Sequence, residues 1–194
     1  MSHPSPAAAA DRRRTIEGVF FLAVFTACIP TANWLVQHVG TTCVPNGPCL
    51  IPVAPGLLAP SAVLVVGLAF VLRDLVQRRL GVGFAALAVV VGAGLSALLA
   101  PPSLVSAAGV AVLVSEFADL AVYTPLQKRK LVLAVVASSI VGLVVDSILF
   151  LQLAFGSLDH LTGQIVGKGW MVLLAIPFII WIRARDERLG IQPA

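Results

Sequence analysis

The chain has 194 residues, of which 59% are hydrophobic and 11% are charged, and its mean hydropathy is +1.00. Soluble domains carry about a quarter of charged residues, so this composition excludes a soluble globular protein and indicates a membrane protein. The formal net charge is +4, and the basic residues stand in short clusters beside apolar stretches. Such clusters are a topology signal and do not indicate a nucleic-acid partner.

Six apolar segments follow one another along the chain. They cover about residues 18–37, 56–72, 82–100, 103–123, 131–155 and 164–182. A helix rises about 1.5 Å per residue, so segments of this length are suited to a hydrocarbon core of about 30 Å. We therefore expect an all-α integral membrane protein, a bundle of six transmembrane helices over residues 18–182. Residues 1–17 and 183–194 are expected to be cytoplasmic tails.

The distribution of basic residues predicts the orientation of this bundle. Twelve of the thirteen Lys and Arg residues lie in the N-terminal tail, the second loop, the fourth loop and the C-terminal tail. The first, third and fifth loops contain none. By the positive-inside rule, both termini are expected to be cytoplasmic. The remaining basic residue, Lys168, lies inside the sixth segment.

The fourth segment carries two acidic residues, Glu116 and Asp119, within the crossing. Each carboxylate near the middle of such a helix costs about 2.5–3.5 kcal/mol on insertion scales. Their spacing of three residues turns both side chains to the same face of the helix. This face is expected to bind a polar solute or an ion. In the alternative interpretation, both carboxylates reach cytoplasmic water near the end of the helix.

Further polar residues lie inside other segments. Asp146 is 15 residues into the fifth segment, which places it about 22 Å from the cytoplasmic end. Lys168 begins near the outer end of the sixth segment, so the two side chains could meet in the outer half of the bundle. Alternatively, Lys168 reaches the outer surface. Asn33 stands in the outer part of the first segment and offers an amide for hydrogen bonding.

Two residue pairs lie near the predicted membrane surfaces. Arg73 and Asp74 follow the second segment and are expected to form an interfacial ion pair, with gating as the alternative role. Cys43 and Cys49 flank the turn-forming sequence VPNGP in the first outer loop, where disulfides persist. A disulfide is predicted there, and two free thiols are the alternative.

Enzymatic chemistry finds little support in the sequence. His3, His38 and His160 lie in the tail or near the outer loops and belong to no recognisable nucleophile or zinc motif. No metal-ligand spacing occurs among the cysteines. We expect neither an enzyme nor a bound metal or cofactor, because transport explains buried carboxylates in a small helical bundle.

Four blocks of residues, in order along the chain, resemble a known family. They are Arg73-Asp74 with Gln77 and Gly81, Ser115-Glu116 with Asp119, Ser139 with Gly142, Asp146-Ser147 and Phe150, and Lys168 with Pro177. The chain resembles the queuosine precursor transporters, also called the vitamin uptake transporter family, over residues 18–177. It departs from the family in its short N-terminal half and at Ser106-Ala107, where the family usually has Ala-Ser.

The resemblance implies a multi-pass protein of the bacterial cytoplasmic (inner) membrane that imports 7-cyano-7-deazaguanine or its aminomethyl derivative. A guanine-like edge offers N–H donors at N1 and at the exocyclic amine, and one carboxylate can accept both. The predicted residues for binding this small planar, purine-like substrate are Asn33, Glu116, Asp119, Asp146 and Lys168. Stacking partners are expected among Phe117, Phe150, Phe155 and Trp170.

Two other functions remain open. The chain could be the substrate-capture subunit of an energy-coupling-factor importer, which requires an ATPase partner. Ala23 and Ala27 form a small-residue pair like the coupling motif of such subunits, although this spacing is common in membrane helices. The chain could also be a membrane scaffold without transport activity. The sequence leaves the oligomeric state open, and a homo-oligomer is possible.

Overall fold

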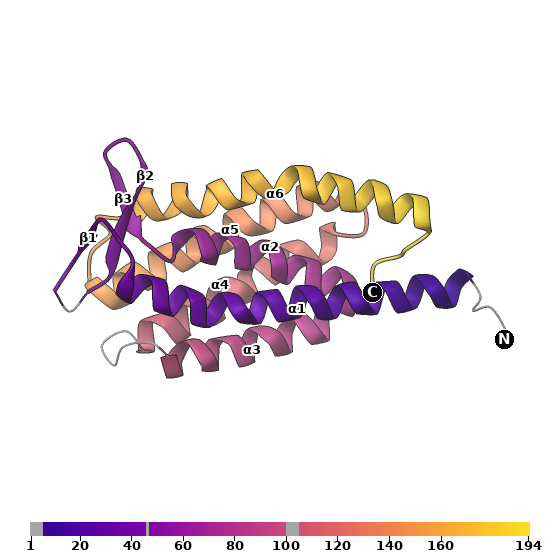
Figure 1. Ribbon diagram of the computed structural model, residues 1–194, viewed down its shortest axis with the longest axis horizontal. Coiled ribbons are helices and arrows are strands. Elements are labelled where there is room, and N and C mark those ends of the chain that lie inside the picture. The colour runs from indigo at the N-terminus through magenta and orange to yellow at the C-terminus, as the bar shows by residue number, and fades with distance from the viewer. Residues whose placement is uncertain (1–5, 46, 100–104) are drawn as a thin grey trace.

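The computed structural model describes residues 6–45, 47–99 and 105–194, which form a helical bundle with a small sheet at one end (Figure 1). The helices are α1 (Pro6–His38), α2 (Val63–Leu80), α3 (Val82–Leu99), α4 (Val105–Leu126), α5 (Leu131–Phe155) and α6 (Leu161–Leu189). The strands are β1 (Thr42–Cys43), β2 (Cys49–Ala54) and β3 (Leu57–Pro60).

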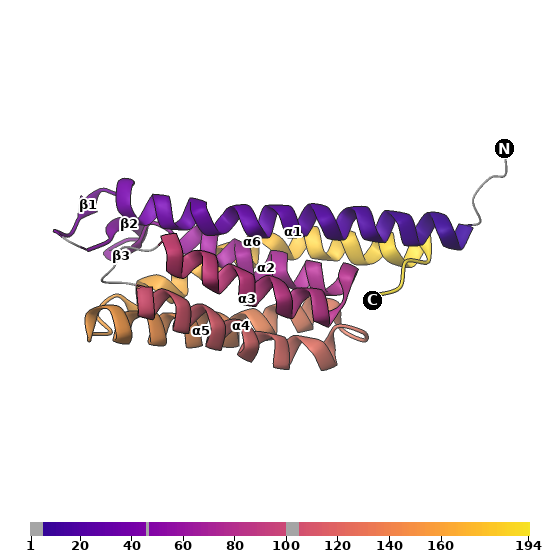
Figure 2. The same ribbon diagram turned by 90° about the horizontal axis from the view of Figure 1, so that it is seen from below.

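The helices lie side by side along one long axis, as the two views at right angles show (Figures 1 and 2). Successive helices run in opposite directions. The start of α1 and the end of α6 therefore lie at the same end of the bundle, opposite the sheet. The basic clusters that flank the helices lie at the end with the termini, which agrees with the charge asymmetry expected from the sequence.

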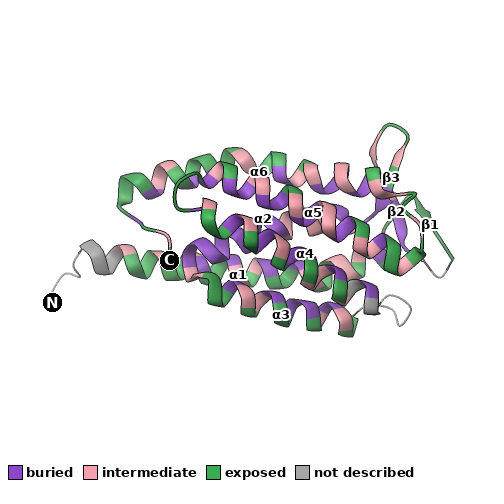
Figure 3. Cartoon of the chain, turned by 180° about the vertical axis from the view of Figure 1, so that it is seen from behind, coloured by how far each residue is buried: buried purple, intermediate pink, exposed green. Residues whose placement is uncertain are grey.

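Five of the helices are long and apolar enough to cross a membrane: α1, α3, α4, α5 and α6. Their outer faces carry large exposed apolar side chains, among them Leu98 at 83%, Leu174 at 69% and Leu87 at 59% exposure. Buried residues gather on the inward faces of the helices, and exposed residues on the outward faces (Figure 3). Such a surface suits lipid, so the fold is that of a helical membrane protein.

The remaining helix, α2, contacts each of the other five helices. Its second half, from Phe70 to Arg79, is buried at every position. This segment includes the charged residues Arg73, Asp74, Arg78 and Arg79, which make α2 too polar to face lipid. A helix of this composition is stable within a membrane protein when its neighbours shield it and supply partners for its charges. The apolar core is built around this helix.

The expected start of the second helix was wrong. Residues 56–60 were assigned to this helix, but they belong to a hairpin in which β2 and β3 pair antiparallel. Gly56 adopts φ +73° in the turn, a conformation that favours glycine and cannot continue a helix. Helix α2 therefore begins at Val63 and continues to Leu80, eight residues past the expected end at Leu72.

The three-stranded sheet was also absent from the expected all-α fold, which assigned residues 39–55 to a loop. Strands β1, β2 and β3 pair in this order, and Cys43 stands opposite Cys49 in the register, where a disulfide joins them. The sheet rests on helix ends. Trp170 Nε1 donates a hydrogen bond to the backbone oxygen of Val53 at 3.0 Å, and Ser61 Oγ donates to that of Leu35 at 2.7 Å.

Other helix bounds follow the expected ones to different degrees. Helix α5 has the expected bounds, residues 131–155, and α3 begins at Val82 as expected. Helix α1 begins at Pro6 and α6 ends at Leu189, so most of the two segments expected to be cytoplasmic tails is helical. The Pro101-Pro102 connection and the expected first residues of the fourth helix, 103 and 104, lie outside the described residues.

Candidate functional site

A cavity lies between the six helices, in the half of the bundle that is nearer the sheet. One part, of about 110 Å³, reaches toward Pro60 and Ala62 beside the sheet. A second part, of about 80 Å³, reaches toward Glu116 in the bundle interior. Both parts are lined by Ala32, Asn33, Val66, Ser96, Val112 and Asp146, so they adjoin. The lining is mostly apolar, with a few polar groups that converge on it, as is usual for small-molecule sites.

One wall of the cavity is formed by an ion pair between Lys168 and Asp146. Lys168 Nζ donates hydrogen bonds to Asp146 Oδ2 at 2.5 Å, to Ser147 Oγ at 2.8 Å and to Gln164 Oε1 at 2.7 Å. These three acceptors match the three N–H donors of an ammonium group, which is why a lysine that is 1% exposed can be accommodated. The pairing expected from the depths of these residues is therefore present, and Lys168 does not reach the outer surface.

Glycine allows α6 to approach α2 at this point. A Cβ atom added to Gly67 would lie 2.6 Å from the backbone oxygen of Lys168, closer than such atoms come in proteins. At the preceding residue of α6, a Cβ atom on Gly167 would lie 2.7 Å from the side chain of Val63. These glycines hold the backbone of Lys168 against α2, which directs its side chain toward α5.

Deeper in the bundle, Arg73 binds three carboxylates. Its Nε donates to Glu116 Oε2 at 2.8 Å, and its two terminal nitrogens lie 3.1 Å from Asp74 Oδ1 and 2.6 Å from Asp119 Oδ2. Ser138 Oγ on α5 donates to Asp74 Oδ2 at 3.0 Å. We call Arg73, Asp74, Glu116 and Asp119 the Arg73 cluster.

The Arg73 cluster corrects one expectation and argues against one alternative. Arg73 and Asp74 form the expected ion pair, but the pair is fully buried between helices and is not interfacial, and α2 begins ten residues before Arg73. The alternative in which Glu116 and Asp119 reach cytoplasmic water does not hold, since they are 5% and 0% exposed. Both outcomes have one cause. The sequence does not reveal that a guanidinium on another helix lies between these carboxylates and removes the need for solvent.

Four of the five residues predicted to bind substrate line the cavity: Asn33, Glu116, Asp146 and Lys168. The fifth, Asp119, lines neither part and lies behind Glu116 against α5. A Cβ atom on Gly142 of α5 would be 2.9 Å from Asp119 Oδ2. Glu116 thus connects the two regions, with Oε2 bound to Arg73 while Oε1 makes no hydrogen bond to another described residue.

Of the four expected stacking residues, one lines the cavity. Phe150 lies in its wall, while Phe117, Phe155 and Trp170 are 45%, 38% and 47% exposed. Phe117 follows Glu116 directly, and consecutive residues of a helix point about 100° apart, so the two cannot both face inward. Gln164 also lines the cavity and was not among the predicted residues, although it lies four residues before Lys168 and hence on the same helix face.

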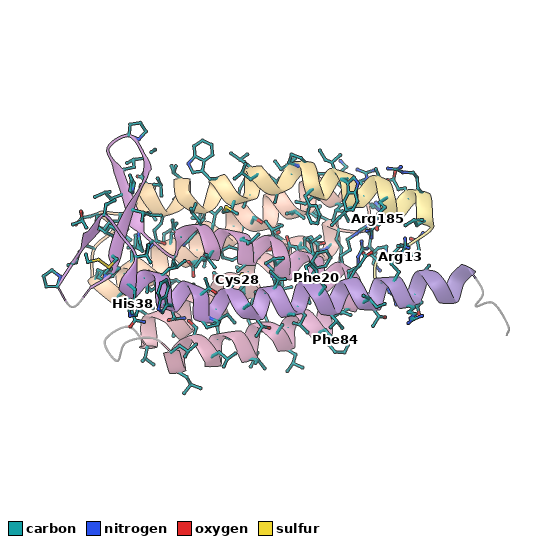
Figure 4. The ribbon with its side chains drawn as sticks, in the orientation of Figure 1. Arg13, Phe20, Cys28, His38, Phe84 and Arg185 are labelled. Atoms are coloured by element: carbon teal, nitrogen blue, oxygen red, sulfur yellow. A yellow bond between two sulfur atoms is a disulfide. The ribbon has the colours of Figure 1, made fainter. Side chains whose placement is uncertain are left out.

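A second ionic network, apart from the cavity, joins the helix ends at the end of the bundle with the termini. Asp186 accepts hydrogen bonds from Arg78 and Arg79 at 2.8–3.0 Å, and Glu17 pairs with Arg79 at 3.0 Å and with Arg185. Arg185 extends from α6 at this end (Figure 4). The described residues contain no group of three or more His, Cys, Asp or Glu side chains suited to hold a metal ion.

The geometry agrees with what comparisons with known proteins found. A family model described as "putative vitamin uptake transporter" matches residues 96–182, from the end of α3 through α4 and α5 into α6. The match includes Glu116, Asp119, Asp146 and Lys168. No curated protein and no solved structure matches the chain. Over residues 96–182, less than half of the chain, this membrane protein is similar to the vitamin uptake transporter family.

Proposed function

We propose that this protein imports a queuosine precursor, 7-cyano-7-deazaguanine or its aminomethyl derivative, through the cavity between its helices. The observation that carries the proposal is the pair of carboxylates in the cavity wall. Glu116 and Asp146 are each bound by a cation through one oxygen. The other oxygen of each makes no hydrogen bond to another described residue, so it remains able to accept one from a substrate.

A deazaguanine base matches this arrangement. Its N1–H and exocyclic amine are adjacent donors, and charge-assisted hydrogen bonds from such donors to a carboxylate are stronger than neutral ones. Asn33 lines the same cavity, and its side-chain amide can donate a hydrogen bond to the carbonyl oxygen of the base. Phe150 offers an aromatic surface for the planar ring. The apolar remainder of the cavity suits a flat ring better than a hydrated metal ion.

The proposal includes six membrane spans with both termini in the cytoplasm of a bacterium. Helix α2 is counted as the sixth span because it lies among the other five. The cavity then opens toward the outer side, beside the sheet, while the basic helix ends face the cytoplasm. Cysteine labelling from outside intact cells checks this topology. A cysteine at position 45 should react, and one at position 194 should not.

Uptake in a bacterial strain unable to synthesise 7-cyano-7-deazaguanine tests the function. Cells that produce this protein should gain queuosine in tRNA when the base is supplied. Glu116→Gln and Asp146→Asn should abolish or severely weaken uptake, because an amide presents a donor toward a donor and leaves it unpaired. The cost of about 1–3 kcal/mol corresponds to a roughly ten- to hundredfold loss of affinity.

Asp159→Asn serves as the control for these variants, because Asp159 is an exposed acid in the loop before α6. All three variants must reach the membrane in amounts similar to the unaltered protein. Near-normal uptake by both Glu116→Gln and Asp146→Asn would refute the cavity as the binding site.

One observation keeps the substrate-capture subunit as a second candidate function. Ala23 and Ala27 are exposed on α1, so this small-residue pair is accessible to a partner within the membrane. In that case, uptake requires an ATPase module. Reconstitution of this chain alone in lipid vesicles separates the two functions, because a capture subunit binds the base but does not accumulate it.

A further inference from the structure

Three buried polar side chains form a line along α4 and the turn that follows it. Asp119, Tyr123 and Gln127 recur every four residues, which turns them to one face of the helix. They are 0%, 0% and 4% exposed. Each carries an oxygen without a hydrogen-bond partner among the described residues: Asp119 Oδ1, the Tyr123 hydroxyl and Gln127 Oε1. Buried polar atoms are rarely left without partners, so three in one line require an explanation.

The line begins at the Arg73 cluster, where the number of carboxylates exceeds the number of cations. One guanidinium faces three carboxyl groups, which would give the cluster a net charge of −2 if all were ionised. A buried uncompensated charge is expensive, and a carboxyl group in such a site commonly becomes neutral by taking up a proton. The Lys168–Asp146 ion pair supplies no net charge that would compensate the cluster.

The other end of the line lies at a second cavity, which is apart from the proposed substrate site. This cavity has a volume of about 160 Å³ and is lined by Gln127, Lys128, Arg129, Arg183 and Asp186, among others. It lies at the end of the bundle that is expected to face the cytoplasm. The line thus connects the Arg73 cluster, in the interior, with a polar cavity at the surface.

A fully buried hydroxyl on α5 is also available to the cluster. Ser139 is 0% exposed, and its Oγ makes no hydrogen bond to a described residue. It precedes Gly142 by three residues and so shares the face of α5 that abuts Asp119. Unpartnered hydroxyl groups thus lie one turn from Asp119 along α4 and on the face of α5 that is turned toward it.

These observations lead to one proposal, which rests on the transport function proposed above. We propose that import is coupled to protons, with Asp119 as the proton carrier and Tyr123 and Gln127 as its pathway to the cytoplasm. A metal cation is a poor alternative ligand, because Arg73 stands among the carboxylates and repels it. A proton can bind there, because it attaches directly to a carboxylate oxygen and removes that group's negative charge. Asp119 also lines neither part of the substrate cavity, so it can be protonated while the cavity is occupied.

Substrate binding is coupled to proton transfer because Glu116 lies between the substrate cavity and the rest of the Arg73 cluster. A substrate edge with two N–H donors requires Glu116 to be ionised, so substrate binding keeps the proton of the cluster on Asp119. On the cytoplasmic side, the O–H bond of Asp119 breaks and the proton passes by the Tyr123 hydroxyl and by water at Gln127 into the cavity. The ionised Asp119 takes up the next proton from the outer side, through Glu116. One proton enters with each substrate molecule.

The charged groups near Asp119 determine how this proton responds to pH. Helix α2 contributes Arg73, Asp74 and, nearer the cytoplasm, Arg78. Helix α4 contributes Glu116, and the facing part of α5 contributes the hydroxyls of Ser138 and Ser139. Helices α1 and α3 present no charged residue to the cluster among those that line the cavity.

Vesicles that contain the purified protein and a pH-sensitive dye test the coupling. With 7-cyano-7-deazaguanine outside, an inward proton gradient should drive accumulation, and addition of the base should acidify the interior. Tyr123→Phe, which removes one hydroxyl and keeps the ring, should lower gradient-driven uptake by about tenfold, because the pathway loses one proton-accepting group. Its affinity for the base, measured in detergent without a gradient, should not change.

Thr124→Val is the matched control. Thr124 is the next residue on α4, and it bonds Gln77 and the Leu120 backbone rather than the cluster, so gradient-driven uptake should remain. If the base accumulates equally with and without the gradient and causes no acidification, the proposal is wrong. Equal uptake by Tyr123→Phe and the unaltered protein would refute the pathway.

A measurement without substrate keeps the proposal separate from the transport function. A protonated carboxyl group has an infrared C=O band distinct from that of carboxylates. At neutral pH, the purified protein should show this band, and Asp119→Asn should lose it while Asp159→Asn keeps it. If the unaltered protein lacks the band, Asp119 carries no proton and the proposal fails, whichever solute is transported. If the band is present but 7-cyano-7-deazaguanine is not bound, the substrate assignment fails and the proton carrier stands.

Discussion

Lys168 shows how a single charged residue is retained inside a membrane bundle. Its three N–H donors are matched by one carboxylate, one hydroxyl and one amide oxygen. Its backbone lies at the close crossing of α6 and α2 at Gly67. Lys168 and Asp146 each need the other, because either charge alone would be buried without an opposite charge.

This mutual requirement predicts how variants of the pair behave. Lys168→Met should destabilise the protein by about 3–5 kcal/mol, since it leaves Asp146 as an unpaired buried carboxylate. The double variant Lys168→Met with Asp146→Asn should regain much of this loss. The midpoint of thermal unfolding in detergent measures both effects. If the double variant unfolds below the single variant, the two charges do not compensate each other.

At the scale of the element, close contacts of α2 set the spacing of the bundle. Gly67→Ala would bring a Cβ atom within 2.6 Å of the α6 backbone, and a backbone cannot move aside as a flexible side chain can. We expect a loss of stability of about 1–3 kcal/mol, as is typical of overpacking. Gly169→Ala is the control, because nothing lies within 4 Å of its Cβ position. Similar unfolding midpoints for the two variants would contradict the close crossing.

The hairpin provides a second prediction at this scale. Cys43 and Cys49 are joined across β1 and β2, at the end of the bundle expected to face the outside. Alkylation of the unreduced protein should therefore modify Cys28 but neither of these two. After reduction, all three cysteines should be modified. Modification of Cys43 and Cys49 before reduction, detected by mass spectrometry of the peptides, would show that they are free thiols.

Helix bounds could be predicted from the sequence where hydrophobicity and turn residues indicate the same boundary. Contacts between residues far apart along the chain could not be predicted. Helix α5 could be delimited because it lies between a basic turn and Gly156, which ends it in the left-handed conformation. The hairpin was mistaken for helix because its residues are as apolar as a membrane span. The contacts of Arg73 could not be foreseen, since Glu116 is 43 residues away and the pairing depends on the packing of α2 against α4.

The candidate site was predictable in part for a similar reason. Intramembrane polar residues are costly, so Asn33, Glu116, Asp146 and Lys168 stood out in the sequence, and all line the cavity. The same argument selected Asp119, which lies outside the cavity. Burial cost alone does not distinguish a residue that faces a cavity from one that pairs with a neighbouring helix.

At the scale of the whole molecule, the two ends of the bundle differ. The end with the sheet contains the cavity proposed to bind substrate, and the other end is held by an ionic network between α1, α2 and α6. The segment expected to be a C-terminal tail is part of this network, because Asp186 is 2% exposed and the backbone N–H of Ala194 donates to the oxygen of Arg78. Alternating access would require this end to open.

The ionic network predicts a large effect of a residue far from the cavity. Asp186→Asn leaves the buried guanidinium groups of Arg78 and Arg79 short of a carboxylate and should cost roughly 3 kcal/mol or more of stability. Glu187→Gln, which alters an exposed i,i+4 pair with Arg183, should cost less than about 1 kcal/mol. Thermal unfolding compares them, and equal midpoints would mean that the network contributes little.

The measurement that tests the central claim most directly is uptake of labelled 7-cyano-7-deazaguanine by vesicles that contain this protein alone. The base should accumulate without any ATPase, Asp159→Asn should behave like the unaltered protein, and Glu116→Gln should accumulate little. Binding of the base without accumulation would contradict transport by this chain and favour the capture subunit. Absence of both binding and uptake, in protein that is folded and correctly inserted, would contradict the substrate assignment itself.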